Sequence, residues 1–207
     1  MQLCRVVYSE QTAVKYFSMI MLEYASASKN DERTGSATNQ DMINRRLIRI
    51  FWLLNGMTIV LLSVFGRSLQ YWVAETIGYS LAAWILGLSM LVLIGVFIFG
   101  LLKDNERLPW VHLVWFVPLF LIVPLFLERV EERMHFLTFG LFGALSMALF
   151  APRYAFIICI LGAGGDELLQ LYLPDRVGDW RDVAFNALAS FGAAIFFHTA
   201  VLSRRNR

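Results

Sequence analysis

Cysteine and charge are both scarce in this chain, and each scarcity excludes a class of protein. The 207 residues include two cysteines, Cys4 and Cys159, which form neither a disulfide framework nor a metal-binding spacing. Charged residues make up 16% of the chain and the net charge is +2, an excess too small to indicate nucleic-acid binding. Walker, G-x-G-x-x-G, H-E-x-x-H and G-x-S-x-G motifs are absent from the sequence, so we expect no cofactor, no metal and no nucleic-acid partner.

Apolar residues are abundant instead, at 58% of the chain with a mean hydropathy of +0.59. A soluble domain is nearer about 45–50% apolar. Because about 20 apolar residues span the bilayer core as a helix, the long apolar runs predict an all-α, multi-pass membrane bundle with about six transmembrane helices. The runs cover residues 47–66, 77–102, 108–127, 134–150, 154–173 and 183–203.

The distribution of basic residues predicts the orientation of these spans. Cytoplasmic loops of membrane proteins carry an excess of Lys and Arg. If the chain crosses at each run, the larger basic group falls on the side that holds both termini, so we expect both termini in the cytoplasm. That group is Arg45, Arg46, Arg49, Lys103, Arg107, Arg153, Arg204, Arg205 and Arg207, against Arg67, Arg129, Arg133, Arg176 and Arg181 on the other side.

Residues 1–41 differ from the rest because they are largely polar. The stretch SKNDERTGSATNQD is typical of an exposed loop or a disordered linker. Before it, apolar residues at helical spacing predict a weak amphipathic helix over residues 11–27 on the membrane surface. A basic pair and an apolar span follow Met42, and we therefore interpret Met42 as an alternative start of the working protein.

The fifth apolar run carries an unusual group of polar residues. Asp166, Glu167 and Gln170 are three and four residues apart, so they share one face of a helix. With a rise of about 1.5 Å per residue, Glu167 would lie roughly 9 Å below the end of that helix. A carboxylate in a membrane span costs about 2.5–3.5 kcal/mol on insertion scales, and such residues usually mark function.

Neighbouring runs bring polar groups to the same depth. The sixth run begins with polar residues at every fourth position, and a histidine opens the fourth run. Arginines in the loop between the fifth and sixth runs would bind a carboxylate or phosphate through paired hydrogen bonds. The candidate acid–base residues are Glu167, Asp166 and His135, and the candidate ligand-binding residues are Gln170, Arg176, Arg181, Asp182 and Asn186.

Close helix packing is expected around this group, because small residues let helix backbones approach each other. The short loop after the fifth run should place Arg176 directly over the group, in contact with a carboxylate or with a bound anion. The small residues expected at the helix contacts are Gly140, Gly143, Gly164, Gly165, Ala189 and Gly192.

Residues 108–203 resemble the VanZ-like family of bacterial membrane proteins. The resemblance rests on a His-Phe pair opening a span, then Asp-Glu-x-x-Gln, then an Arg after a Pro, and then Asp-x-x-x-Asn followed by small residues. The resemblance implies a four-helix core over 108–203 in the bacterial inner membrane. Two additional helices over 42–107 and a basic tail over 204–207 lie outside the resemblance. The family takes its name from a protein linked to glycopeptide resistance. The matching residues are His135, Phe136, Asp166, Glu167, Gln170, Pro174, Arg176, Asp182 and Asn186.

Three functions are consistent with these residues. The first is a binding protein whose polar pocket recognises a polar or anionic headgroup in the outer leaflet, for example that of a lipid-linked envelope precursor. The second is a membrane-embedded hydrolase or transferase with Glu167 as acid or base. The third is an accessory subunit in which the polar residues only clamp helices together. The expected partners are membrane lipids, a lipid-linked precursor and other membrane proteins.

Overall fold

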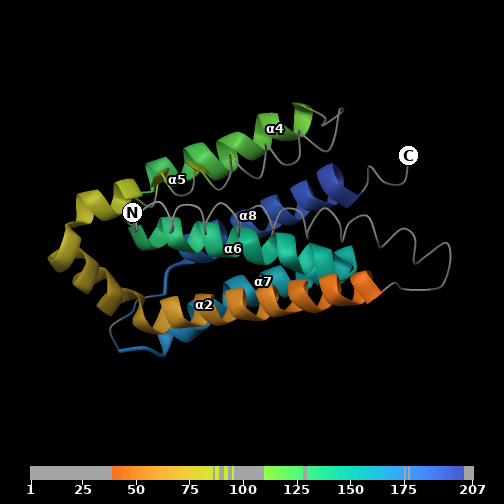
Figure 1. Ribbon diagram of the computed structural model, residues 1–207. Helices are drawn as coiled ribbons and strands as arrows, with labels where there is room; N and C mark the ends of the chain where they lie inside the picture. The colour runs from red at the N-terminus through yellow and green to blue at the C-terminus, as the bar shows by residue number, and fades with distance from the viewer. Residues whose placement is uncertain are drawn as a thin grey trace, which may run out of the picture.

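The computed structural model describes residues 39–85, 87–88, 91–92, 95, 110–127, 130–174, 176 and 178–202, and all elements in them are helical (Figure 1). The all-α class is thus confirmed for this part of the chain. The amphipathic helix expected at 11–27 and much of the run at 77–102 lie outside the described residues. The runs predicted at 47–66, 108–127, 134–150, 154–173 and 183–203 all coincide with described helices.

Helix α2 (Asn39–Ile77) is much longer than the span predicted at 47–66. Its 39 residues extend about 58 Å at 1.5 Å per residue, roughly twice the bilayer core. The predicted span was too short because it included only the apolar run, whereas a helix continues through polar residues until a residue breaks it. The break is Gly78, whose φ of 81° lies in the left-handed region that favours glycine.

The remaining helices follow the sequence signals for helix ends. A proline opens α7, where its missing N–H is not needed, and the Asp179 side chain caps α8 by accepting the Arg181 N–H at 2.9 Å. The π-helical turn η1 begins at Pro118 and joins α4 to α5. The bounds are α4 Trp110–Val117, η1 Pro118–Ile122, α5 Val123–Phe126, α6 Val130–Leu149, α7 Pro152–Leu171, α8 Trp180–Phe196 and η2 Phe197–Leu202.

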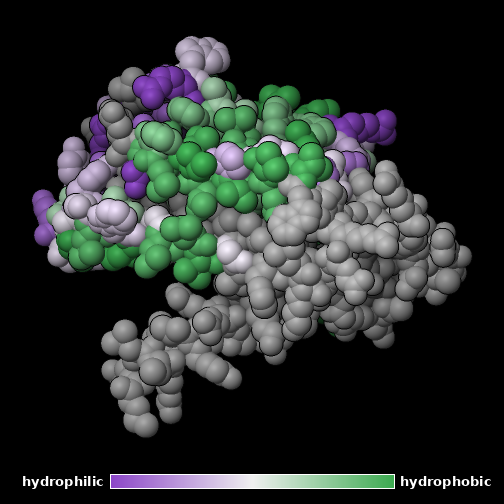
Figure 2. Space-filling view, turned by 90° about the horizontal axis from the view of Figure 1, so that it is seen from above, coloured by the Kyte–Doolittle hydropathy of each residue, from purple (hydrophilic) through white to green (hydrophobic). Residues whose placement is uncertain are grey.

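Three of the described helices are long and apolar enough to cross a membrane, namely Met42–Ile77, Pro152–Leu171 and Trp180–Ala200. Val111–Phe126 is apolar but shorter. Large apolar side chains are exposed along α2 and α7, and Figure 2 shows apolar surface over much of the described face. The chain is therefore suited to a membrane, and the count of six spans stays a prediction.

Helix α6 is the centre of the bundle and packs against α2, α7 and α8 (Figure 1). Phe136 and Phe139 of α6 are completely buried in the core. At the crossing of α6 with α8, a Cβ on Gly143 would overlap the backbone of Ser190, so only glycine permits this approach. Gly140 and Gly192 make room for side chains of η1, in the third apolar run, and not for a contact among the fourth, fifth and sixth runs.

The prediction that Gly164 and Gly165 lie at helix contacts is wrong. Each is exposed, and a Cβ built on either would meet nothing within 4 Å among the described residues. The two glycines lie on the face of α7 directed away from the bundle. Their small size therefore serves no helix contact that the structure describes.

Candidate functional site

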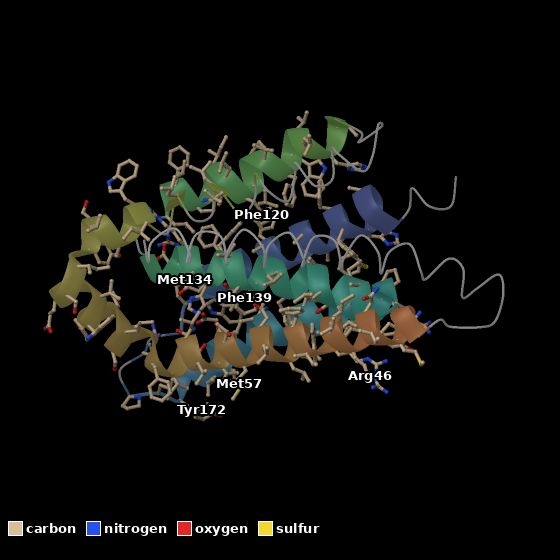
Figure 3. All side chains as sticks on the ribbon, in the orientation of Figure 1. Arg46, Met57, Phe120, Met134, Phe139 and Tyr172 are labelled. Carbon is tan, nitrogen blue, oxygen red and sulfur yellow. The ribbon has the colours of Figure 1, made fainter. Side chains whose placement is uncertain are left out.

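The polar residues predicted from the sequence meet inside the bundle. Asp166, Glu167 and Gln170 of α7 are each at most 5% exposed, and Asn186 of α8 and His135 of α6 are also buried. Together with Ser63 of α2, they form what we call the polar cluster. It lies near the end of the bundle that carries loop 172–179, which we call the loop end; Figure 3 shows Tyr172 and Met134 toward this end and Arg46 toward the opposite end.

Asp166 receives hydrogen-bond donors from several helices. Gln170 Nε2 donates to Asp166 Oδ2 over 3.1 Å from within α7, and Asn186 Nδ2 donates to the same oxygen over 3.4 Å from α8. The Ser63 hydroxyl of α2 contacts Asp166 Oδ1. His135 Nε2 of α6 lies 3.8 Å from Oδ2, close enough to form an ion pair when the imidazole is protonated. Helices α2, α6, α7 and α8 therefore meet at one carboxylate.

Glu167 is bound differently from Asp166. Gln170 Nε2 donates to Glu167 Oε1 over 3.3 Å, and the backbone N–H of Asp179 donates to Oε2 over 3.0 Å. The carboxylates of Asp166, Asp179 and Asp182 all lie near enough to repel a negative charge on Glu167. Glu167 thus joins the polar cluster to the start of α8.

Ser63 is the site residue that the sequence interpretation missed. It is completely buried, and it lies 8 and 19 positions after the buried Asn55 and Asn44 in the same helix. At about 100° per residue, these three residues share one face of α2. A stripe of polar residues on one face of an apolar helix was the signal that could have identified it.

Arg176 is not placed as predicted. Its Nε donates to the Ser63 carbonyl over 3.1 Å and its Nη2 to the Leu62 carbonyl over 2.9 Å, so the guanidinium binds backbone of α2 rather than a carboxylate. Gly66 provides the space, because a Cβ there would lie 2.5 Å from Arg176 Nη2. Arg176 does lie beside the polar cluster, and it holds the loop against α2.

The other two predicted ligand-binding residues lie at the edge of the polar cluster. Arg181 is exposed at the start of α8, and Asp182 is partly buried beside it. The structure thus separates the predicted residues into a buried group and a loop-end group. The buried group can accept or donate hydrogen bonds, and the exposed Arg181 is placed to meet an anion.

The chemistry of the polar cluster is that of two carboxyl groups, one imidazole, two amides and one hydroxyl. Ser190, also buried on α8, donates its hydroxyl to the carbonyls of Asn186 and Ala187 within its own helix. Among the described residues, no group of three or more His, Cys, Asp or Glu side chains is arranged to hold a metal ion. The arrangement suits hydrogen bonding and proton transfer.

Comparison of the chain with protein-family models, with curated proteins and with solved structures finds no match. The resemblance to the VanZ-like family therefore rests on the motif residues of the polar cluster and its loop, and membership of that family stays a prediction.

Proposed function

We propose that the protein is a VanZ-like envelope protein of the bacterial inner membrane that recognises the polar headgroup of an outer-leaflet lipid. The observation that carries this proposal is the convergence of α2, α6, α7 and α8 on the buried Asp166 and Glu167. Burying two adjacent carboxyl groups among apolar helices is unfavourable, and such intramembrane groups usually serve a function. A lipid-linked envelope precursor is the ligand class that combines an apolar tail with a large polar headgroup.

The contacts favour a headgroup that carries hydroxyl or amine donors. Glu167 and Asp166 are hydrogen-bond acceptors when ionised, and the amides of Gln170 and Asn186 can orient a ligand by donating and accepting. Arg176 already binds carbonyls of α2, so the exposed Arg181 is the better contact for a phosphate. The proposed ligand therefore places its donors at the carboxyl groups and its phosphate at the loop end.

The lipids that copurify with the protein test this proposal. The wild type is compared with Asn186→Ala, which removes an amide from the polar cluster, and with Thr199→Ala, which removes a polar group from the other end of the same helical segment. We expect one lipid class to be enriched over the bulk membrane in the wild type and in Thr199→Ala, and to be lost from Asn186→Ala. The same lipid profile in all three proteins would refute headgroup recognition.

A membrane-embedded hydrolase or transferase is the second candidate, because His135 lies 3.8 Å from Asp166 and Gln170 donates to both Asp166 and Glu167. Glu167→Gln keeps the shape of the side chain but cannot transfer a proton. If the protein is an enzyme, the wild type should copurify with the product and Glu167→Gln with the substrate. If it is a binding protein, the same lipid should copurify with both. If Asn186→Ala and Glu167→Gln only reduce the amount of folded protein, the polar cluster is a helix clamp and the protein is an accessory subunit.

A further inference from the structure

Helix α2 lies outside the segment that carries the VanZ-like motif, but it is joined to that segment by buried polar contacts. Trp52 Nε1 donates to Ser146 Oγ over 2.9 Å, and Asn55 Nδ2 donates to the Thr138 carbonyl over 3.0 Å. Both acceptors belong to α6. These two contacts fix the position of α2 along α6 and so determine which of its residues reaches the polar cluster.

Ser63 is the residue of α2 that reaches it. Its hydroxyl lies within hydrogen-bond distance of the Ile59 carbonyl, at 3.0 Å, and also contacts Asp166 Oδ1. The bond to the preceding turn is ordinary for a hydroxyl in a helix, since the exposed Thr58 makes the same bond to Leu54 over 2.9 Å. The contact with a carboxylate of another helix distinguishes Ser63 from Thr58.

The main chain of Ser63 makes a second connection. Its carbonyl accepts Arg176 Nε, while the adjacent Leu62 carbonyl accepts Arg176 Nη2. Arg176 precedes α8, and Asp179 in the same loop donates its N–H to Glu167. One residue of α2 therefore contacts Asp166 through its side chain and the loop next to Glu167 through its backbone.

We infer that Ser63 is a positioning residue of the polar cluster, which orients Asp166 and sets the place of Arg176. The inference rests on the proposed function, since it assigns Ser63 to the same site. The amides of Gln170 and Asn186 both donate to Oδ2, so Ser63 is the described donor at Oδ1. Without its hydroxyl, Asp166 Oδ1 loses the hydrogen bond from α2, and the carboxyl group is less restrained.

Reactivity with dicyclohexylcarbodiimide, an apolar reagent that modifies carboxyl groups in apolar surroundings, tests this inference directly. The labelled Asp166 peptide is quantified by mass spectrometry in the purified full-length protein. The variants are Ser63→Ala, Ser63→Cys, which keeps the size but is a weaker donor, and the matched control Thr58→Ala. Because Asp166 Oδ1 loses its donor, we expect Ser63→Ala to raise the labelling rate of Asp166 about tenfold, Ser63→Cys to raise it less, and Thr58→Ala to leave it unchanged.

Equal labelling of Asp166 in the wild type, Ser63→Ala and Thr58→Ala would overturn the inference. If Ser63→Ala does not accumulate in the membrane, the test is the comparison of Ser63→Cys with the wild type. An equal labelling rate of Asp166 in these two proteins would then overturn the inference. The labelling needs no bound lipid. Failure to find a copurifying lipid would therefore count against the proposed function and not against the role of Ser63.

Discussion

At the scale of single residues, the two adjacent carboxyl groups of the polar cluster have different hydrogen-bond partners. Asp166 is contacted from α2, α7 and α8, and these donors offset part of the cost of burying a carboxylate. Glu167 accepts a hydrogen bond from the backbone N–H of Asp179 at the loop end. Asp166 is therefore bound to neighbouring helices, whereas Glu167 is also bound to the loop end.

Gly66→Ala should detach Arg176 from α2 without changing Arg176 itself. The added Cβ would lie 2.5 Å from Arg176 Nη2, so the guanidinium must leave the carbonyls of Leu62 and Ser63. A hydrogen bond from a charged group contributes about 1.5–3 kcal/mol when buried, and less for this partly buried side chain. We expect the loss of these hydrogen bonds to exceed the gain of about 1 kcal/mol that alanine gives over glycine in a helix. Thermal unfolding in detergent should show a lower midpoint.

Gly56→Ala is the matched control, because its Cβ would lie 4.0 Å from Phe142, an ordinary contact. We expect this variant to unfold at or above the temperature of the wild type. In an Arg176→Ala background, Gly66→Ala should become as harmless as Gly56→Ala. A Gly66→Ala protein as stable as Gly56→Ala while Arg176 is present would contradict the contact.

The buried acidic and amide residues could be predicted from the sequence because charges within an apolar run are conspicuous and unfavourable unless they meet other polar groups. Asp166, Glu167 and Asn186 are of this kind. Ser63 was missed because a serine can satisfy its hydroxyl within its own helix and so gives no such signal. The partner of Arg176 could not be predicted because a long side chain reaches any acceptor near it, and the carbonyls of α2 become near only in the folded bundle.

At the scale of helices, the contact between α6 and α8 depends on Gly143. Because the obstacle to a Cβ is the backbone of Ser190 and not a flexible side chain, Gly143→Ala must push the two helices apart. Overpacking of this kind costs about 1–3 kcal/mol or more. We expect a lower midpoint of thermal unfolding and less protein in the membrane.

Gly164→Ala is the control for that prediction, since nothing lies within 4 Å of its Cβ. It should be neutral or stabilise the protein by up to about 1 kcal/mol through helix propensity. Similar losses of stability in both variants would show that the α6–α8 contact is not as close as described. Sequence alone could not separate these glycines, because both lie in apolar helices and only the packing shows which face meets a neighbour.

Sequence also located the helices better than it located their ends. Apolar runs reveal where a helix is buried or meets lipid, and five of these runs coincide with described helices. The full length of α2 was not visible from its apolar run, because polar residues extend the helix to the break at Gly78. The contacts of Trp52 and Asn55 with α6 were likewise missed, since a partner helix cannot be identified from one helix alone.

At the scale of the whole molecule, the two ends of the bundle carry different charge. Exposed arginines, including Arg46, Arg49 and Arg153, lie at the end where α2 and α7 begin. The loop end carries the carboxyl groups of Glu167, Asp179 and Asp182 as well as Arg176 and the exposed Arg181. Lys and Arg favour the cytoplasmic side of a membrane, so the larger number of basic residues predicted on the side of Arg46, Arg49 and Arg153 supports the proposal that the loop end faces the outer leaflet.

The most direct measurement of this central claim is the accessibility of single cysteines on intact cells. In a variant with Cys4 and Cys159 replaced by alanine, Asp179→Cys places a thiol at the loop end and Arg153→Cys places one at the opposite end, both at exposed positions. A membrane-impermeant thiol reagent should label the cysteine at position 179 on intact cells and the cysteine at position 153 only after the cells are opened. Labelling of position 153 but not of position 179 on intact cells would place the polar cluster at the cytoplasmic side and contradict recognition of an outer-leaflet headgroup.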